Sequence, residues 1–233
     1  MRRYCAWDIE TAPTAEALAE PYPEDKRLPP SNYSKPETIS EWRRKDRESW
    51  ETDRIKEFSF SPRTGRIVAL SLNFKGEEYL DLSALDAKDE KQLIIDALTI
   101  MSDTGRPGAR NDLLVGFNSR NFDWPFLMLR MCYHRIDHLA VCPDRQWWQA
   151  GHNRYSLINV DVRDIVTFNQ PGQKGTLSDW AAWAGQAVKD TAGSQVYQWV
   201  QEGNVDAITT HCRGDAQRTG ALFERVYPLY AGA

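Results

Sequence analysis

The chain has 233 residues, of which 41% are apolar, 27% charged and 11% aromatic, and its formal net charge is −4. This composition excludes a disordered chain, a collagen and a coiled coil, and the slight acidity argues against a protein that coats DNA through a large basic excess. No apolar run approaches the roughly 20 residues of a membrane span, and Asp8 comes too early for a secretory signal.

The first third of the chain predicts a strand, a long interruption and then a pair of strands. Residues 4–9 form a short apolar stretch that is typical of a strand. Residues 12–36 hold six of the twelve prolines, which predicts a long irregular segment. A turn at 61–65 leads into a strand over 66–74, and residues 78–82 can pair with it.

Residues 37–57 predict a highly charged helix, which belongs to an insertion that we expect to span residues 12–60. The apolar residues of this helix are too sparse to form a full core-facing stripe. The favoured interpretation is a solvated helix that lies across the domain, since charge runs are usually solvated. Two alternatives stay open: an arm that binds a protein partner, or one that touches phosphates through Arg43, Arg44, Lys45 and Arg47.

The rest of the chain alternates helical and strand patterns. Apolar residues recur at helical spacing over 89–101, and the apolar run 113–117 predicts a central strand buried on both faces. The later predictions are a helix from near residue 123, a strand over 159–168, a helix capped by Thr176 or Ser178, and mostly helix in the last forty residues. This order predicts a single α/β domain, with a mixed sheet and flanking helices.

Acidic residues stand in three separated motifs. The first, Asp-x-Glu-Thr, carries Asp8 and Glu10 after the first apolar stretch. Side chains two apart on a strand share a face, so both carboxylates can reach one metal ion. The second motif, Asn-x-x-x-Phe-Asp, starts at Asn118 and puts Asp123 at a helix N-terminus, as a site residue or only as a helix cap.

The third motif is His-x-x-x-Asp near the C-terminus. If this segment is helical, the four-residue spacing stacks His211 and Asp215 on one face of the helix. Taken alone, the two residues are an ordinary exposed pair.

Together the three motifs resemble the DEDD (DnaQ-like) superfamily of 3′–5′ exonucleases, which has a ribonuclease H-like fold. Within it, the chain looks most similar to predicted exonucleases related to the proofreading domain of family B DNA polymerases. Residues 61–68 and 197–215 look like further parts of that group.

The resemblance implies a ribonuclease H-like domain in which Asp8, Glu10, Asp123 and Asp215 bind two divalent ions, Mg²⁺ or Mn²⁺. Hard cations prefer oxygen ligands, and two of them can clamp the attacking and leaving oxygens of a phosphodiester. One departure concerns His211. Members with the four-residue spacing normally carry Tyr there, whereas members with His place their Asp five residues later. The imidazole can still orient or deprotonate the attacking water.

The same motifs imply contacts with the substrate from Thr11, Asn118, Phe122 and Trp124. Asn118 either binds the substrate or orders its own loop. The two aromatic residues either pack beside the terminal base or belong to the core.

The function implied is a metal-dependent 3′–5′ exonuclease that releases nucleoside 5′-monophosphates from single-stranded DNA, with a place in DNA repair or replication. Four scattered cysteines without a C-x-x-C pair favour reduced thiols in a cytosol, and the resemblance to a group common in bacteria and phages implies a bacterial or phage-encoded protein. The alternatives are an exoribonuclease, a non-catalytic nucleic-acid-binding module, and a subunit of a repair or replication complex that binds its partner through residues 37–57.

Overall fold

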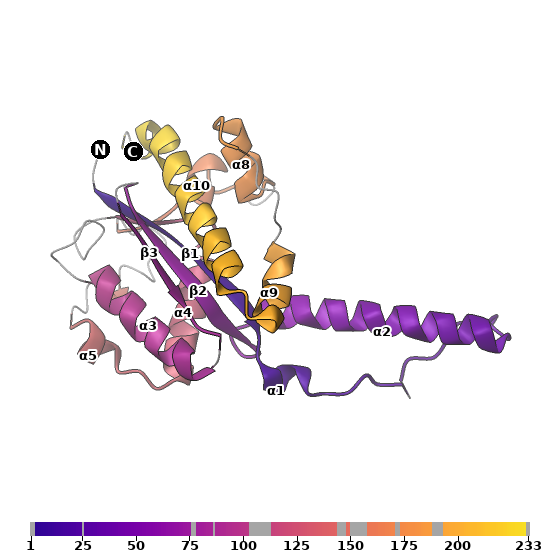
Figure 1. Cartoon of the computed structure of the whole chain (residues 1–233). Coiled ribbons are helices and arrows are strands. Elements are labelled where there is room, and N and C mark those ends of the chain that lie inside the picture. The colour runs from indigo at the N-terminus through magenta and orange to yellow at the C-terminus, as the bar shows by residue number, and fades with distance from the viewer. Residues whose placement is uncertain are drawn as a thin grey trace.

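The structure is a computed structural model that describes residues 3–24, 26–75, 78–85, 87–102, 113–143, 148–149, 158–170, 173–187 and 193–231. Its centre is a five-stranded sheet of order β3-β2-β1-β4-β5, with helices on both faces (Figure 1). The strands are β1 (Tyr4–Pro13), β2 (Gly65–Phe74), β3 (Glu78–Ser83), β4 (Leu113–Gly116) and β5 (Asn159–Asp161). The predicted α/β class, with a mixed sheet and flanking helices, is confirmed.

The direction of the strands changes at β1. Strand β2 runs antiparallel to β1 and to β3, whereas β4 runs parallel to β1 and β5 parallel to β4. The parallel pair is short, because β4 pairs only with the first residues of β1, from Tyr4 to Ala6. The second half of β1 therefore has one edge without a β4 partner.

Side chains of β1 alternate between the two layers of helices. Cys5 and Trp7 pack in the core cluster formed with α3 (Ala87–Ser102) and α4 (Asp123–Tyr133), while Tyr4 and Ala6 pack in the cluster formed with α10 (Val205–Ala231). Because this alternation has a period of two, Asp8 and Glu10 continue the face that α10 covers. Figure 1 shows α10 lying along one face of the sheet, with α3 and α4 on the other.

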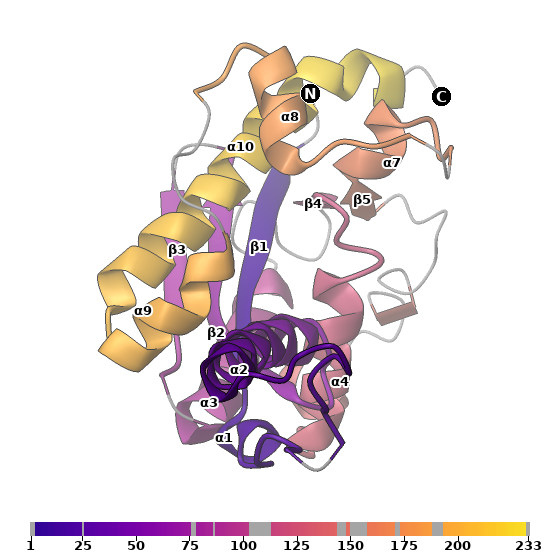
Figure 2. The ribbon, with the colours of Figure 1, turned by 90° about the vertical axis from the view of Figure 1, so that its right-hand side faces the viewer.

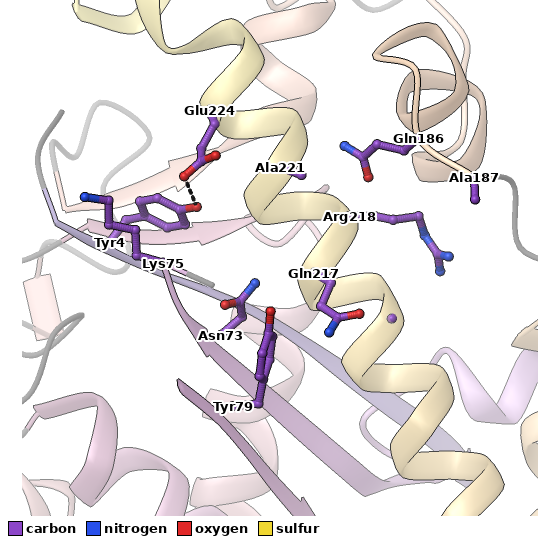
Figure 3. Close-up of a pocket in the computed structure, with 11 residues that line it drawn as sticks. Tyr4, Asn73, Lys75, Tyr79, Gln186, Ala187, Gln217, Arg218, Ala221 and Glu224 are labelled. Carbon is purple, nitrogen blue, oxygen red and sulfur yellow. Dashed lines mark hydrogen bonds between the residues drawn. The ribbon is translucent and has the colours of Figure 1, made fainter. Parts of the chain in front are cut away.

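The second half of α10 lies close to the sheet. A Cβ atom on Gly220 would lie 3.3 Å from Cβ of Ala6 and 3.2 Å from Nδ2 of Asn73, so glycine permits this approach. One turn later, the hydroxyl of Tyr4 donates to Oε1 of Glu224 at 3.0 Å (Figure 3). These contacts fix the position of α10 over β1.

The smaller elements complete the two layers. They are α1 (Ala15–Leu18), α5 (His138–Val141), α7 (Val162–Val166), α8 (Leu177–Trp183), the 3-10 turn η1 (Gly193–Gln195) and α9 (Val196–Glu202). Thr176 caps α8 in a capping box, as predicted for one of two candidates. Among the described residues, no helix is at once long and apolar enough to cross a membrane.

The strand predicted over 159–168 is wrong beyond its first three residues. The side chain of Asp161 accepts the backbone N–H of Arg163 at 3.0 Å and caps α7, so the chain turns into a helix there. The first strand is longer than predicted, because β1 continues to Pro13 and thus includes Thr11.

The helix predicted over 37–57 is confirmed as α2 (Pro36–Ser59), and most of its residues are solvent-exposed. It does not lie across the domain, however. Its C-terminal end meets β1, and the helix projects away from the sheet (Figure 1). The buried Arg54 holds that end, since its guanidinium donates to the carbonyl oxygens of Ala17 and Glu20 at 2.6 and 2.7 Å.

Candidate active site

The first two predicted site residues lie on the second half of β1. Asp8 is half-buried, and the side chain of Glu10 is largely buried on the same face of the sheet. The register between β1 and β2 shifts directly after Glu10, where one extra residue of β2 forms a bulge. Bulges often occur next to active sites, where they change the direction of a side chain.

Two further predicted residues face Glu10 from α10. His211 is 5% exposed, and its Nε2 lies 3.3 Å from Oε1 of Glu10 and 3.6 Å from Oδ2 of Asp215. The interpretation of His211 and Asp215 as an ordinary exposed pair is therefore wrong. The other oxygen of Asp215 forms an ion pair with Arg218, so this carboxylate is contacted from two sides.

Asp123 reaches the same place from α4. It is 4% exposed, and its Oδ1 accepts the backbone N–H of Ile9 at 3.2 Å, on the edge of β1 that β4 leaves uncovered. Burial raises the pKa of Asp123 to about 7, the charges of Asp161 and Asp215 add to the rise, and the N–H of Ile9 opposes it. Asp123 is thus more than a helix cap, because it accepts a hydrogen bond from Ile9, the residue between Asp8 and Glu10.

Cys212 is a site residue that the motifs did not single out. Its thiol donates to the backbone oxygen of Asp8 at 3.3 Å and lies 3.7 Å from Oδ2 of the same residue. Burial raises the pKa of the Cys212 thiol, and the charges of Asp8 and Glu10 raise it further. The thiol therefore stays protonated and acts as a donor. The only signal in the sequence was its position inside the third motif.

The donor atoms at this place suit a hard divalent cation. Single donor atoms of Glu10, His211 and Asp215 lie within 4.8 Å of one another, and so do those of Asp8, Glu10 and Cys212. Carboxylate oxygens predominate in both groups, as Mg²⁺ and Mn²⁺ prefer. Burial is the main cause of the raised pKa of Asp123, and the charges of Asp161 and Asp215, which a bound cation would offset, add to the rise.

Two of the residues predicted to contact substrate lie beside Glu10. Thr11 and Phe122 line a groove of about 590 Å³ that includes Glu10 itself. Trp124 does not reach this groove. It is 2% exposed, and its ring packs edge-on against that of Trp7 at 6.2 Å. Of the two interpretations of Trp124, the structure supports a core residue.

Asn118 orders its own loop. Its side-chain oxygen accepts from Nη1 of Arg163 at 3.1 Å, and its backbone N–H donates to Oδ1 of Asp161 at 2.8 Å. Oδ2 of Asp161 also accepts the N–H of Arg120 at 3.1 Å. Asp161 is thus a second residue that the motifs did not single out, and it fixes the loop that leads from β4 to Asp123.

Three comparisons relate the chain to known proteins. A family model described as "Predicted 3'-5' exonuclease related to the exonuclease domain of PolB" matches residues 59–232. This range includes Asp123, His211 and Asp215, whereas Asp8 and Glu10 precede it.

Two relatives are archaeal. A DNA polymerase of Archaeoglobus fulgidus is 22% identical over 174 residues, which are 72% of this chain and 21% of the polymerase. An uncharacterised protein of Methanocaldococcus jannaschii is 29% identical over 182 residues, which are 73% of this chain and 90% of that protein. The chain thus spans about a fifth of the polymerase.

A solved structure shares the fold. The family B DNA polymerase from the hyperthermophilic archaeon Pyrobaculum calidifontis matches with a TM-score of 0.58 and 20% identity, over 98% of this chain and 25% of that chain. Together with the strand order, this likeness confirms the predicted ribonuclease H-like fold.

Proposed function

The chain belongs to the family of predicted 3′–5′ exonucleases related to the exonuclease domain of PolB, and from this membership we propose a metal-dependent exonuclease of single-stranded DNA that releases nucleoside 5′-monophosphates. One observation carries the proposal. Strand β1, helix α4 and helix α10 bring four carboxylates to one end of the sheet, those of Asp8, Glu10, Asp123 and Asp215.

These four residues would hold two divalent ions, Mg²⁺ or Mn²⁺. When bound, such ions lower the pKa of a water molecule and stabilise the oxygen that leaves a phosphodiester. The residues of the chain determine where this chemistry happens. The thiol of Cys212 orients the Asp8 carboxylate, and the N–H of Ile9 orients that of Asp123.

His211 is the proposed proton acceptor. Its Nε2 lies between the carboxylates of Glu10 and Asp215, and its ring stacks edge-on against Trp199 with 5.4 Å between the centroids. This packing limits the ring to one orientation. An imidazole held beside two carboxylates can take the proton of the attacking water.

The preference for DNA rests on the name of the A. fulgidus relative, a DNA polymerase. The preference for single strands rests on the groove at Glu10, whose aromatic walls suit unpaired bases. The same relative supports a proposed contribution to replication or repair. All four cysteines are described and free, which suits a reducing cytoplasm.

The test is degradation of a 5′-labelled single-stranded DNA oligonucleotide with Mg²⁺ or Mn²⁺, beside an RNA of the same sequence. We expect a ladder that shortens from the 3′-end and is absent with EDTA. Asp8→Ala and Asp215→Asn should lower the rate about a thousandfold or more. Each removes a ligand of a metal ion that would stabilise the charge of the transition state by several kcal/mol.

The matched control is Asp206→Asn, which removes an exposed carboxylate from the first turn of α10, the same helix as Asp215. Its rate should equal that of the unmodified protein. An oligonucleotide that stays intact with both metals, although the folded protein binds it, would favour the non-catalytic binding module.

A further inference from the structure

The groove that opens at Glu10 has a wall that the family model does not cover. Its floor is the end of β1, and η1 with the start of α9 forms one side. The other side is the last two turns of α2, of which only Ser59 falls within the matched residues 59–232. Figure 2 shows α2 end-on beside β1, with α9 nearby.

Helix α2 presents one regular face to this groove. Thr52, Ile55, Lys56 and Ser59 line it, and their spacing of three and four residues puts them on the same side of a helix. Arg54 points elsewhere and anchors the helix to the segment around α1, so the wall is held in place. The position of this groove wall is therefore fixed by contacts within the chain.

Lys56 differs from the other cations of α2. Arg43 and Arg47 pair with Glu24, Arg44 with Glu48 and Lys45 with Glu41, while Arg54 lies near Glu20. Lys56 is exposed and has no ion pair with any described residue. A cation at the edge of a carboxylate site matches a phosphate of the strand whose end is being hydrolysed.

Aromatic rings also line this groove. Phe60 is 58% exposed, and its ring meets that of Phe122 edge-on with 5.6 Å between the centroids. Tyr197 lines the facing wall. Exposed aromatic faces bind unpaired bases by stacking. The volume of about 590 Å³ falls within the ~300–1,000 Å³ of ordinary ligand pockets.

We propose that this groove is a second nucleotide subsite, which rests on the proposed exonuclease function. It holds the unpaired nucleotide adjacent to the terminal one. Lys56 binds its phosphate, and Phe60 stacks on its base. The continuity of the groove with Glu10 carries this assignment, because a strand that ends at the carboxylates must leave along a path beside them.

The first test measures binding of a single-stranded oligonucleotide by fluorescence anisotropy in EDTA, where the strand stays intact. We expect Lys56→Ala to weaken binding about 3- to 10-fold at low salt, and to reduce the slope of log K against log [salt] by about 0.7, the value for one phosphate contact on a single strand. Lys56→Arg should restore both.

The control is Lys45→Ala, which removes an exposed lysine from the same helix, one that pairs with Glu41 at 2.8 Å. It should leave the affinity and the slope unchanged. The subsite is overturned if Lys56→Ala binds with unchanged affinity and slope, or if Lys45→Ala loses as much. Because binding is measured without catalysis, this result is independent of whether the ladder assay succeeds.

The second test addresses the base. A series of oligonucleotides carries one abasic nucleotide at each of the four 3′-terminal positions. We expect Phe60→Ala to lose about tenfold in affinity for the intact strand, and to lose nothing further when the base adjacent to the terminal one is removed. Phe168→Ala, which removes another exposed ring, is the control. If removal of the base lowers the affinity of Phe60→Ala and of the unmodified protein equally at every position, the result would contradict base stacking by Phe60.

Discussion

Asp123 connects the proposed catalysis with stability at the scale of a single residue. Its carboxyl is almost fully buried, and it sits beside other acids. A buried carboxyl with a raised pKa favours the protonated form in the folded state. The free protein is thus most stable with this proton in place, whereas the proposed metal ligand needs the charged form.

The pH dependence of unfolding follows from this shift. The pKa of Asp123 rises from its ordinary value of 3.8 to about 7, so its contribution to stability is complete below pH 3.8 and is lost as pH rises through 7. In EDTA, we expect the free energy of unfolding to fall between pH 5 and 8 by about 2–3 kcal/mol more than in Asp123→Asn. Urea denaturation of both proteins across this pH range measures the free energy of unfolding.

Asp206→Asn should follow the unmodified protein, since Asp206 is exposed. Mg²⁺ should reduce the fall, because a cation stabilises the charged carboxylate. Parallel pH profiles for the unmodified protein and Asp123→Asn would contradict a raised pKa at this residue.

The motifs singled out Asp8, Glu10, Asp123 and Asp215 as candidates because the proposed chemistry fixes their type and the elements fix their spacing. They did not locate Cys212, whose contact with Asp8 depends on how deeply α10 packs on β1. They also left two interpretations of Trp124 open, because the sequence beside Asp123 does not show whether an aromatic side chain faces the core or the solvent.

At the scale of elements, a buried ion pair joins the start of α3 to the end of α4, and its glutamate also contacts the sheet. Glu90 and Arg130 are 0% and 1% exposed and form two hydrogen bonds, at 2.6 and 2.9 Å. Glu90 also accepts from Ile67 of β2 and contacts His134. Although burial opposes it, the hydrogen bonds of Arg130 and His134 hold the pKa of Glu90 below its usual value.

Removing one partner of this pair should be costly. We expect Glu90→Gln to lower the free energy of unfolding by about 3–5 kcal/mol, because it leaves the buried charge of Arg130 uncompensated. Chemical denaturation at pH 7 measures the loss. Glu57→Gln, which changes an exposed glutamate of α2, should cost less than 0.5 kcal/mol, on the order of ordinary surface changes. Similar losses from both would show that the pair contributes little.

The elements that sequence patterns missed have local causes. The run from Asn159 alternates as a strand should, but Asp161 ends it, because its carboxylate can cap a helix that begins at the next residue. The alternation of apolar and polar residues does not show that Asp161 caps a helix instead of continuing the strand. The direction of α2 could not be predicted from the sequence either, since it depends on the contacts of Arg54 with residues more than thirty positions away.

At the scale of the whole molecule, charge is distributed unevenly along α2. The cations of its projecting half pair with glutamates of the chain itself, whereas Lys56 stands at the groove. The phosphate-binding arm weighed from the sequence would need those cations to be available. Their pairing instead leaves this half as a solvated surface, and a protein partner there stays a prediction.

This distribution has a measurable consequence. The triple variant Arg43→Ala, Arg44→Ala and Arg47→Ala removes three positive charges, and we still expect the affinity for single-stranded DNA at 0.15 M salt to change by less than about twofold. Charges farther from the strand than a Debye length of about 8 Å are largely screened. A loss comparable to that of Lys56→Ala would instead show that the strand runs along α2.

Gly220 makes the alignment of the site depend on a position outside it. Residue 220 lies about 7.5 Å beyond Asp215 along the axis of α10, and any larger side chain there would displace its neighbours by a few tenths of an ångström. A functional constellation tolerates errors of only about 0.5 Å. Substitutions at position 220 would therefore use up most of that tolerance, although the residue lies outside the candidate site.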